Sequence, residues 1–510
     1  MATSNLKWQQ NSTCRWERDV DEAEAFYTTM ARKFEGLFDH FNLLHGYLLT
    51  IGQELAGTVK SQILHALQGA WICLRYDHPT IASWVEYDHH AKRCKKIYEG
   101  FLKDEVHRAP PAWLKETFQI VSSGQSGQEW CNSDPPAPKL PTLFIVTRNS
   151  IPGAGFTADI VLRSPHDVID GIGSLHLLQN LLKYAARAYE DPRAFALPIF
   201  GDEWKNLSPP LRVAANIPAN LTPEQDAKLN EILQHNAKLR KEIDIAAVPF
   251  RCGRTIPARH QRVALRLTQQ ETSKVMAACK QLGSSVTHVY HAVVALLVLG
   301  SLERRVTRRL VRYINYCLIN ERAHCQKQYS TPQHAVAVYH SVSGRSLAID
   351  WTVPAISDEA KSEHERRHDL LRIIKQVKDH YLTIRNDQAH IGLVPSYWGL
   401  STPAYPVGRE VPPVPRPNET PSASISSLGV IDNIISPKHG FFEVDDPWVT
   451  GEELGTGLGL FLVTFRGRMC LSAAYNDAWH DRAEVMDFLK RCNELVFTTL
   501  DVSPRVASSD

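Results

Sequence analysis

The chain has 510 residues, of which 57 are Lys or Arg and 55 are Asp or Glu. This near balance of charge gives no electrostatic reason to expect binding to nucleic acid or to an anionic membrane surface. The hydrophobic fraction of 43% is that of a globular protein. The length exceeds what one ordinary core accommodates, so two or three domains are expected.

The ten cysteines are scattered and include no C-x-x-C pair. A disulfide framework belongs to short secreted chains and a zinc ribbon needs closely spaced pairs, so we expect reduced cysteines. The first residues form no apolar signal core, and the longest apolar run, 292–299, is far too short to cross a bilayer. We therefore expect a cytoplasmic protein without a membrane segment.

Helix-forming patterns dominate residues 16–120. Helices are predicted there at 21–37, 55–76 and 91–102. After a proline-rich break at 135–141, strands are predicted at 142–147 and 156–162, with a turn at Pro152–Gly155 between them. A further helical pattern begins at Gly171.

An aperiodic stretch with three prolines, 201–218, predicts the domain boundary. We divide the chain into an N-terminal lobe, 1–205, and a C-terminal lobe, 206–510. Thr222, Pro223 and Gln225 then have the residue types of a helix start with a capping box.

The second lobe repeats the mixture of strands and helices. Its predicted strands are 263–267, 310–319, 336–340, 458–465 and 469–475, and its predicted helices are 273–282, 286–299, 362–385 and one that begins at Asp481. The last two strands flank Arg466–Arg468 as a hairpin, and the proline-rich stretch 403–421 is predicted to be a surface loop. This order indicates an α/β protein with two lobes, each a mixed sheet with flanking helices.

One short motif has the residues that acyl transfer needs. His166, Asp170 and Gly171 form the pattern His-x-x-x-Asp-Gly between a predicted strand and a predicted helix. An alcohol must lose its proton as it attacks a thioester, and a neutral imidazole with an ordinary pKa near 6.5 is the natural acceptor. Asp170 need not touch the substrate: it can pair with an arginine and lock the turn, while Gly171 lets the chain fold back tightly. The same pattern also occurs as a plain histidine beside a helix cap, but its place in a two-lobed α/β chain favours the catalytic interpretation.

This context resembles the superfamily of chloramphenicol-acetyltransferase-like folds, which includes the BAHD acyltransferases, fungal acetyltransferases and condensation domains of peptide synthetases. The segment Arg163–Gly171 is similar to its motif, and the buried helix 286–299 to that of its second lobe. Ser426–Gly429 resembles the superfamily's Ser-x-x-Gly type strand near the acyl-donor channel. Among its groups, the chain resembles the fungal trichothecene 15-O-acetyltransferases in its N-terminal signature, Trp16–Tyr27, and in three shorter segments. These are His78–Ser83, Asn320–Arg322 and Tyr339–Gly344.

The resemblance implies a channel between the lobes and a role for each matching residue. His166 would be the general base, Asp170 a structural residue paired with Arg322, and Gly171 the turn residue. Weaker candidates for the donor channel are Ser426, Ser427, Gly429, Tyr475 and Asn476. The resemblance implies acetyl-CoA as a co-substrate with no bound cofactor or metal, a sesquiterpenoid alcohol as acceptor, and a monomer.

Two other interpretations stay open. Condensation domains commonly have a second histidine directly before the catalytic one, where this chain has Pro165, which favours a free CoA ester over a carrier-bound donor. A carrier-protein thioester remains the alternative donor, and a non-catalytic condensation-like binding domain is a third possibility. The BAHD-type Asp-Phe-Gly-Trp-Gly signature is absent, and Gly455–Gly459 is expected to be a mobile loop.

His364–His368 is a literal H-E-x-x-H, the pattern of zinc proteases. On the predicted helix both histidines point away from the apolar face, so a solvated charged face is the preferred interpretation. His288 and His291 lie on the apolar helix and are expected to be satisfied core or pocket-lining residues.

Overall fold

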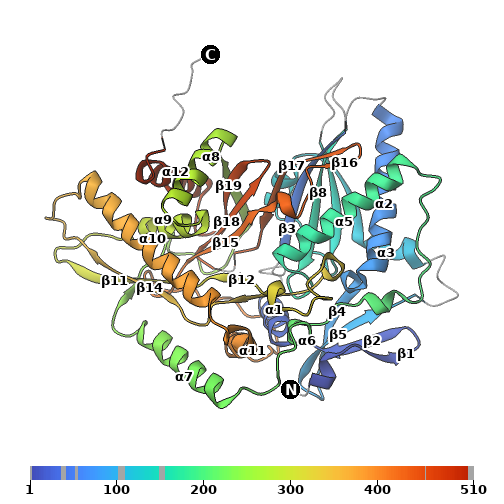
Figure 1. Cartoon of the computed structure of the whole chain (residues 1–510), viewed down its shortest axis with the longest axis horizontal. Coiled ribbons are helices and arrows are strands. Elements are labelled where there is room, and N and C mark those ends of the chain that lie inside the picture. Colours follow the sequence, from blue (N-terminus) through green and yellow to red (C-terminus); the bar gives the residue numbers. More distant parts are fainter. Residues whose placement is uncertain are drawn as a thin grey trace.

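The computed structural model describes residues 3–35, 42–51, 56–101, 109–148, 156–453 and 455–502. These residues form two α/β lobes side by side, with several smaller elements below them (Figure 1). The predicted turn at Pro152–Gly155 and the outer ends of the helices predicted at 21–37, 55–76 and 91–102 lie outside the described residues.

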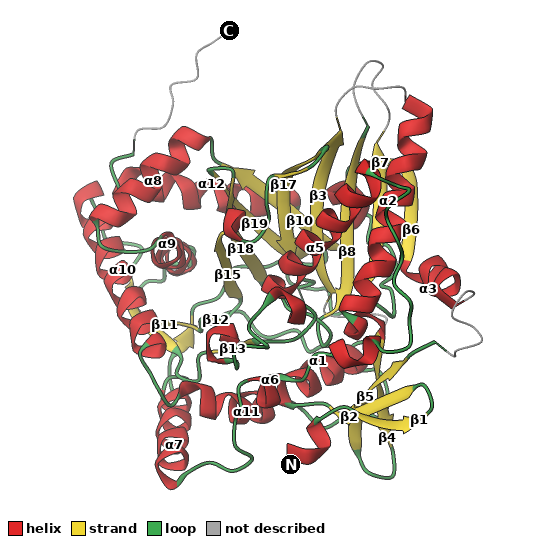
Figure 2. Ribbon diagram, turned by 45° about the vertical axis from the view of Figure 1, so that its right-hand side comes forward, coloured by secondary structure: helices red, strands yellow, loops and turns green. Residues whose placement is uncertain are grey.

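The first lobe is built on a six-stranded sheet (Figure 2). Its strands, in spatial order, are β16 (Lys438–His439), β17 (Phe442–Thr450), β3 (Asn42–Ile51), β8 (Thr157–Pro165), β7 (Thr142–Arg148) and β6 (Phe118–Gly124). Helices α2 (Ala56–Asp77) and α5 (Gly171–Glu190) pack against each other and share one hydrophobic core with this sheet. Two short helices, α3 (Ala109–Thr117) and α4 (Gly127–Asn132), lie beside it.

Strand β17 comes from the C-terminal half of the chain but belongs to the first sheet. It pairs antiparallel with β3, from Phe442 opposite Ile51 to Thr450 opposite Leu44. The C-terminal half of the chain therefore contributes a strand to the sheet of the first lobe. A single division point in the sequence does not separate the two lobes.

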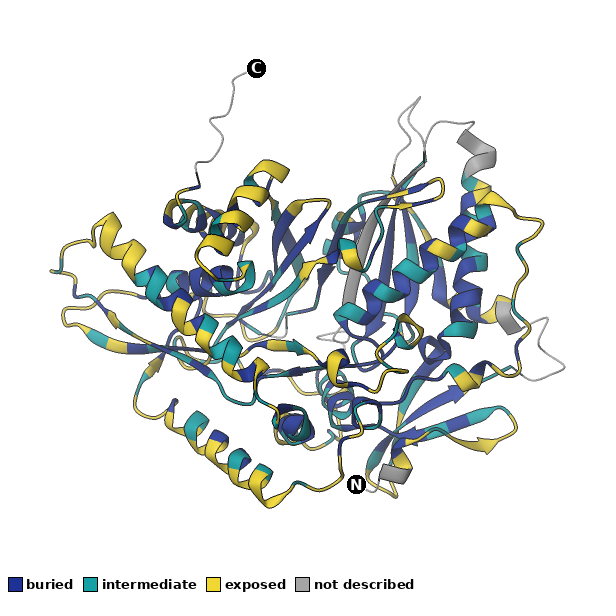
Figure 3. Cartoon of the chain, viewed as in Figure 1, coloured by how far each residue is buried: buried dark blue, intermediate teal, exposed yellow. Residues whose placement is uncertain are grey.

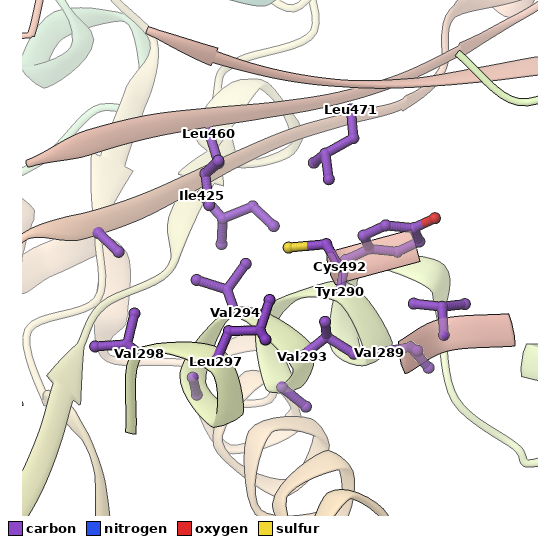
Figure 4. Packing of buried hydrophobic residues seen from close by; sticks show 14 of the residues in the cluster. Val289, Tyr290, Val293, Val294, Leu297, Val298, Ile425, Leu460, Leu471 and Cys492 are labelled. Carbon is purple, nitrogen blue, oxygen red and sulfur yellow. The ribbon is translucent and has the colours of Figure 1, made fainter. Parts of the chain in front are cut away.

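The second lobe has a four-stranded sheet. Its spatial order is β10 (His260–Arg266), β19 (Arg468–Asn476), β18 (Leu458–Phe465) and β15 (Ala423–Val430). Helix α9 (Val286–Gly300) is buried on nearly all sides, and its apolar side chains lie beneath Ile425, Leu460 and Leu471 of the sheet (Figure 4). Helices α8 (Gln269–Gln281), α10 (Glu363–Arg385) and α12 (Arg482–Thr499) surround α9, with their exposed faces outward (Figure 3).

Three smaller sheets complete the fold. They are β1 (Gln9–Ser12), β2 (Arg15–Asp19), β5 (Arg93–Glu99) and β4 (Ser83–Asp88); β14 (Leu347–Val353), β11 (Arg309–Asn315) and β9 (Asp244–Ile245); and β12 (Leu318–Asn320) with β13 (His340–Val342). Helices α1 (Glu22–Lys33), α6 (Leu211–Ala214), α7 (Pro223–Lys238) and α11 (His390–Ser401) lie near them (Figure 1). The antiparallel pair β12–β13 matters most, because it lies beside the turn that carries His166.

Most predicted elements of the second lobe are confirmed. For three of its helices, the capping residues explain where the helix begins. Thr222, Ser362 and Asp481 each accept a hydrogen bond from the third helical residue, whose side chain returns one to the cap. In the β18–β19 hairpin, Arg466 and Gly467 both have positive φ, as a two-residue primed turn requires.

Four predictions were wrong in whole or in part. Residues 91–102 contain strand β5 and not a helix, because the backbone of Arg93–Glu99 pairs with β2 on one edge and β4 on the other, and its alternate side chains are buried on one face. The predicted strand 336–340 is irregular until His340, and strand 310–319 is broken between Asn315 and Leu318. Leu458 and Gly459 begin β18 and pair with β15, which confirms the strand predicted at 458–465 and contradicts, for these two residues, the mobile loop predicted at Gly455–Gly459.

No single helix in the described part of the chain combines the length and apolar character of a membrane span. Within the same described ranges, the pair α8 and α9 reaches that threshold together, but the two helices are bent by 93°.

Candidate active site

His166 lies in the turn between β8, which ends at Pro165, and α5, which begins at Gly171. Asp170 is the N-cap of α5: its Oδ1 accepts a hydrogen bond from the backbone N–H of Gly173 at 2.7 Å. The backbone N–H of Asp170 donates to the carbonyl of Ala337 at 3.1 Å. The turn is thereby fixed both to its own helix and to the segment before β13.

The second oxygen of Asp170 connects the turn to the C-terminal half of the chain. Oδ2 accepts hydrogen bonds from the backbone N–H of Tyr339 at 2.7 Å and from Nη1 of Arg322 at 2.8 Å. Both Asp170 and Arg322 are buried. Burial alone would raise the pKa of Asp170, but the Arg322 guanidinium and these hydrogen bonds hold it below its ordinary value. Asp170 is therefore ionised, and its contacts fix the position of its side chain. This is consistent with a structural role in the turn.

The His166 ring is half-buried and packs against two other rings, which also contact each other. Tyr27, from α1, stacks on it with ring centroids 4.1 Å apart and an interplanar angle of 15°. His340, from β13, has its ring centroid 5.2 Å from that of His166. The Tyr27 hydroxyl and His340 Nε2 are 2.7 Å apart, within hydrogen-bond distance. Three segments distant in the sequence thus meet at one imidazole.

The imidazole of His166 is neutral at physiological pH. Burial and the neighbouring His340 lower its pKa to about 3, and hydrogen bonds to the backbone at His166 itself and at Ile169 oppose this only in part. A neutral imidazole has a free lone pair, so His166 is in the form that accepts a proton.

His166 opens onto a cavity of about 910 Å³, a size suited to small molecules. The cavity is lined by both halves of the chain, and its wall is more apolar than polar. Tyr27, His166, Gly171 and His340 belong to this wall, together with Pro413–Pro415, Thr420–Ser424 and Gly455–Phe461. The proline-rich loop and the Gly-rich segment are therefore parts of the cavity wall.

The weaker sequence candidates divide into two groups. Ser426 and Ser427 of β15 line the cavity, and Ser427 Oγ lies 2.8 Å from Thr287 Oγ1 at the start of α9. Gly429, with φ of +69°, lies beyond them past a β-bulge and is not in the cavity wall. Tyr475 packs into the core of the second lobe, because the neighbouring Ala474 takes the cavity-facing position on β19. The Asn476 carboxamide binds the backbone of Ala258 and Ala478.

Gly171 does not have the backbone conformation expected of it. It is not among the described glycines with positive φ, and an added Cβ would meet only Leu428 Cδ2, at 3.6 Å. The crowded position is Gly173, where a Cβ would lie 2.1 Å from the carbonyl oxygen of Ala335 and 2.9 Å from Arg322 Nη2. The expectation that the turn needs glycine at 171 was wrong, because Asp170 as N-cap makes the bend.

Sequence reasoning singled out neither Tyr27 nor His340 as a site residue. Both occur in segments that carry the group resemblance, Trp16–Tyr27 and Tyr339–Gly344. That coincidence was the only signal available, because their approach to His166 depends on the packing of α1 and β13.

The remaining histidine motifs lie elsewhere. His364 and His368 are exposed on α10, as predicted from the helix geometry. His291 is buried in α9, as expected for a core residue, but among the described residues only Nδ1 has a partner, the Tyr381 hydroxyl at 3.2 Å, while Nε2 is buried without a hydrogen bond. Among the residues that the structure describes, no three His, Cys, Asp or Glu side chains are grouped so as to hold a metal ion.

Comparisons with known proteins extend over nearly the whole chain. No protein-family model matches. The chain is 23% identical over 505 residues to acetyltransferase pigO of Monascus ruber, covering 98% of this chain and 99% of the relative. It is 24% identical over 481 residues to O-acetyltransferase pigM of the same organism, covering 93% of this chain and 84% of the relative.

The fold is also found among solved structures. The TRI3 trichothecene 15-O-acetyltransferase from Fusarium sporotrichioides superposes with a TM-score of 0.78 at 18% identity, covering 98% of this chain and 99% of that one. The first condensation domain of the calcium-dependent antibiotic synthetase superposes with a TM-score of 0.57 at 14% identity, covering 97% and 99%. The chain therefore has the two-lobed chloramphenicol-acetyltransferase-like fold, and the two relatives that it resembles over most of its length are acetyltransferases.

Proposed function

We propose that the protein is an acetyl-CoA-dependent O-acetyltransferase that esterifies a hydroxyl of a fungal secondary metabolite. The observation that carries the proposal is the neutral imidazole of His166 in the wall of a 910 Å³ cavity lined by both halves of the chain. Full-length similarity to two fungal acetyltransferases supports the reaction class and the small-molecule acceptor.

The reaction follows from the chemistry of a thioester. His166 removes the proton of the acceptor hydroxyl as the oxygen attacks the thioester carbonyl carbon. The tetrahedral intermediate collapses, the carbon–sulfur bond breaks, and the imidazolium returns the proton to the leaving thiolate. No covalent enzyme intermediate is required, because the thioester already has a good leaving group. Asp170, with Arg322, would keep the turn in place throughout.

For the acceptor, we propose a trichothecene-like sesquiterpenoid alcohol, acetylated at the hydroxyl corresponding to C-15. The support is the group resemblance in the N-terminal segment and at Asn320–Arg322, together with the TM-score of 0.78 to a trichothecene 15-O-acetyltransferase. The cavity wall is compatible with such a compact alcohol, since it is mostly apolar with scattered hydroxyls such as Ser426 and Ser427.

The test is an assay with a panel of CoA esters and terpenoid alcohols, with product detection by mass spectrometry. The wild type should acetylate an alcohol at a rate that saturates with acetyl-CoA. His166→Ala should lose roughly 10²- to 10⁴-fold in turnover, the usual size of a general-base effect. His368→Ala, on the exposed face of α10, is the matched control and should keep wild-type turnover.

Near-wild-type turnover by folded His166→Ala would exclude the mechanism. Transfer from a carrier-protein thioester, without transfer from free acetyl-CoA, would favour the condensation-type donor instead.

A further inference from the structure

A cluster of buried charges lies directly behind the His166 turn. It consists of Arg18 on β2, Glu24 on α1 and Lys96 on β5, whose exposed fractions are only 4%, 3% and 0%. Arg18 and Lys96 stand opposite each other in the β2–β5 pairing, so their backbones are fixed by one small sheet. Arg18 and Glu24 belong to the N-terminal signature, Trp16–Tyr27, and the proposed reaction uses neither of them.

The three side chains are firmly connected. Arg18 donates to both carboxylate oxygens of Glu24, at 2.6 and 2.7 Å, and Lys96 Nζ donates to Glu24 Oε1 at 2.8 Å. Burial would raise the pKa of Glu24, but the two cations hold it at about 2, so the carboxylate stays ionised. Such a group is costly to bury and gives a fixed geometry only while all its members remain.

The Lys96 ammonium has a further partner outside the cluster. Nζ donates to the backbone carbonyl of Asp167 at 2.5 Å. Asp167 directly follows His166, so this bond holds the turn from the side of the N-terminal sheet. Asp170 and Arg322 hold the same turn from the C-terminal half.

We propose that Lys96 is a positioning residue for His166, which acts by holding the Asp167 carbonyl while Glu24 and Arg18 fix its ammonium. The turn is thus held between two ion pairs, one from each half of the chain. The N-terminal signature then has two roles. Arg18 and Glu24 anchor Lys96. Tyr27, which lies on the same helix as Glu24, stacks on the imidazole of His166.

This inference rests on the proposed function for its kinetic consequence. A displacement of a catalytic group by about 1 Å can cost about 10²-fold in rate, because the reacting atoms lose alignment. Lys96→Met keeps the length of the side chain but removes the donor. We expect its kcat to fall by about 10- to 100-fold, while KM for acetyl-CoA and for the alcohol stays within about twofold, since Lys96 is not in the cavity wall.

The neighbouring residue gives a matched control. Lys95 lies on the same strand but faces outward, with its side chain 30% exposed and paired with Glu17. Lys95→Met should leave kcat and both KM values unchanged. If folded Lys96→Met has wild-type kcat, or if the two variants lose equal activity, the proposal is wrong.

A variant that removes a buried charge can fail to fold. If Lys96→Met does so by circular dichroism and thermal melting, Glu24→Gln takes its place, because it keeps Lys96 but weakens its anchor. A lower kcat at unchanged KM in Glu24→Gln supports the proposal, and an unchanged kcat overturns it.

A readout independent of activity separates this inference from the proposed function. The imidazole signals of histidine-labelled protein are assigned to His166 by comparison with His166→Ala. Lys96→Met, or Glu24→Gln in its place, should shift the His166 signals, and Lys95→Met should not. If the wild type acetylates no alcohol but the shift is present, the proposed function fails and the positioning role stands. If His166→Ala abolishes transfer but Lys96→Met leaves both the signals and kcat unchanged, the function stands and the positioning role fails.

Discussion

The guanidinium of Arg322 donates to the carboxylate of Asp170 at 2.8 Å, across 152 positions of sequence. This ion pair joins the segment that directly follows β12 to the turn that carries His166. Because Asp170 also caps α5 and binds the backbone of Tyr339, one carboxylate serves three separate segments.

Asp170→Asn should destabilise the protein and slow it. The substitution leaves Arg322 buried without a counter-charge and puts an amide N–H₂ where only acceptors fit, so the free energy of unfolding should fall by about 3–5 kcal/mol. Denaturant unfolding measures this. Asp358→Asn, which breaks the exposed pair with Arg308, is the control and should cost far less. An Asp170→Asn variant with wild-type stability would remove the bracing role.

Tyr27 should contribute to turnover through its ring. Tyr27→Leu removes the face that stacks on His166, and kcat should fall roughly two- to tenfold, the range of an aromatic pair worth about 0.5–1.5 kcal/mol. Tyr27→Phe keeps the ring but loses the contact with His340 Nε2, and should lose less. Steady-state kinetics of both variants decide the point. Equal losses in the two variants would assign the effect to the hydroxyl instead.

The pH dependence of kcat/KM should be displaced to low pH. In free solution an imidazole is half protonated near pH 6.5, but the pKa of His166 is lowered to about 3. The active neutral form therefore persists as the pH falls, and kcat/KM should stay level from about pH 8 to about pH 5 and decline only below that. To control for unfolding, samples exposed to low pH are returned to neutral pH and assayed a second time. A half-maximal point near 6.5 would contradict the buried, neutral state of His166.

Two glycines of the same turn should respond in opposite ways. Gly171→Ala should fold normally, because its Cβ has an ordinary 3.6 Å contact with Leu428. Gly173→Ala should lose about 1–3 kcal/mol or more, because its Cβ would overlap the Ala335 carbonyl and crowd Arg322, neither of which can move freely. Thermal melting of the two variants side by side is the measurement. Equal melting temperatures would show that the turn has more room than this structure gives it.

The sequence was sufficient to predict those elements that are determined by residues close to one another along the chain. The capping residues Thr222, Ser362 and Asp481, the Arg466–Gly467 turn and the strand–His166–helix order are all set by residues within a few positions of one another. His166 was recognisable as a candidate base for the same reason: its residue type and its place between a strand and a helix are visible along the chain.

What the tertiary structure decided depends on contacts between distant segments. Residues 91–102 have helix-forming composition, yet Arg93–Glu99 is a strand because both its edges are paired. Tyr27, His340 and Lys96 come to the His166 turn only through the packing of α1, β13 and β5, and no spacing in the sequence encodes those approaches. The sequence by itself identified His166 as the candidate general base, and the tertiary structure decided what holds its imidazole neutral and in place. The physical reason is that the residue type and the turn are local properties, whereas burial and ion pairing arise only when remote side chains exclude water together.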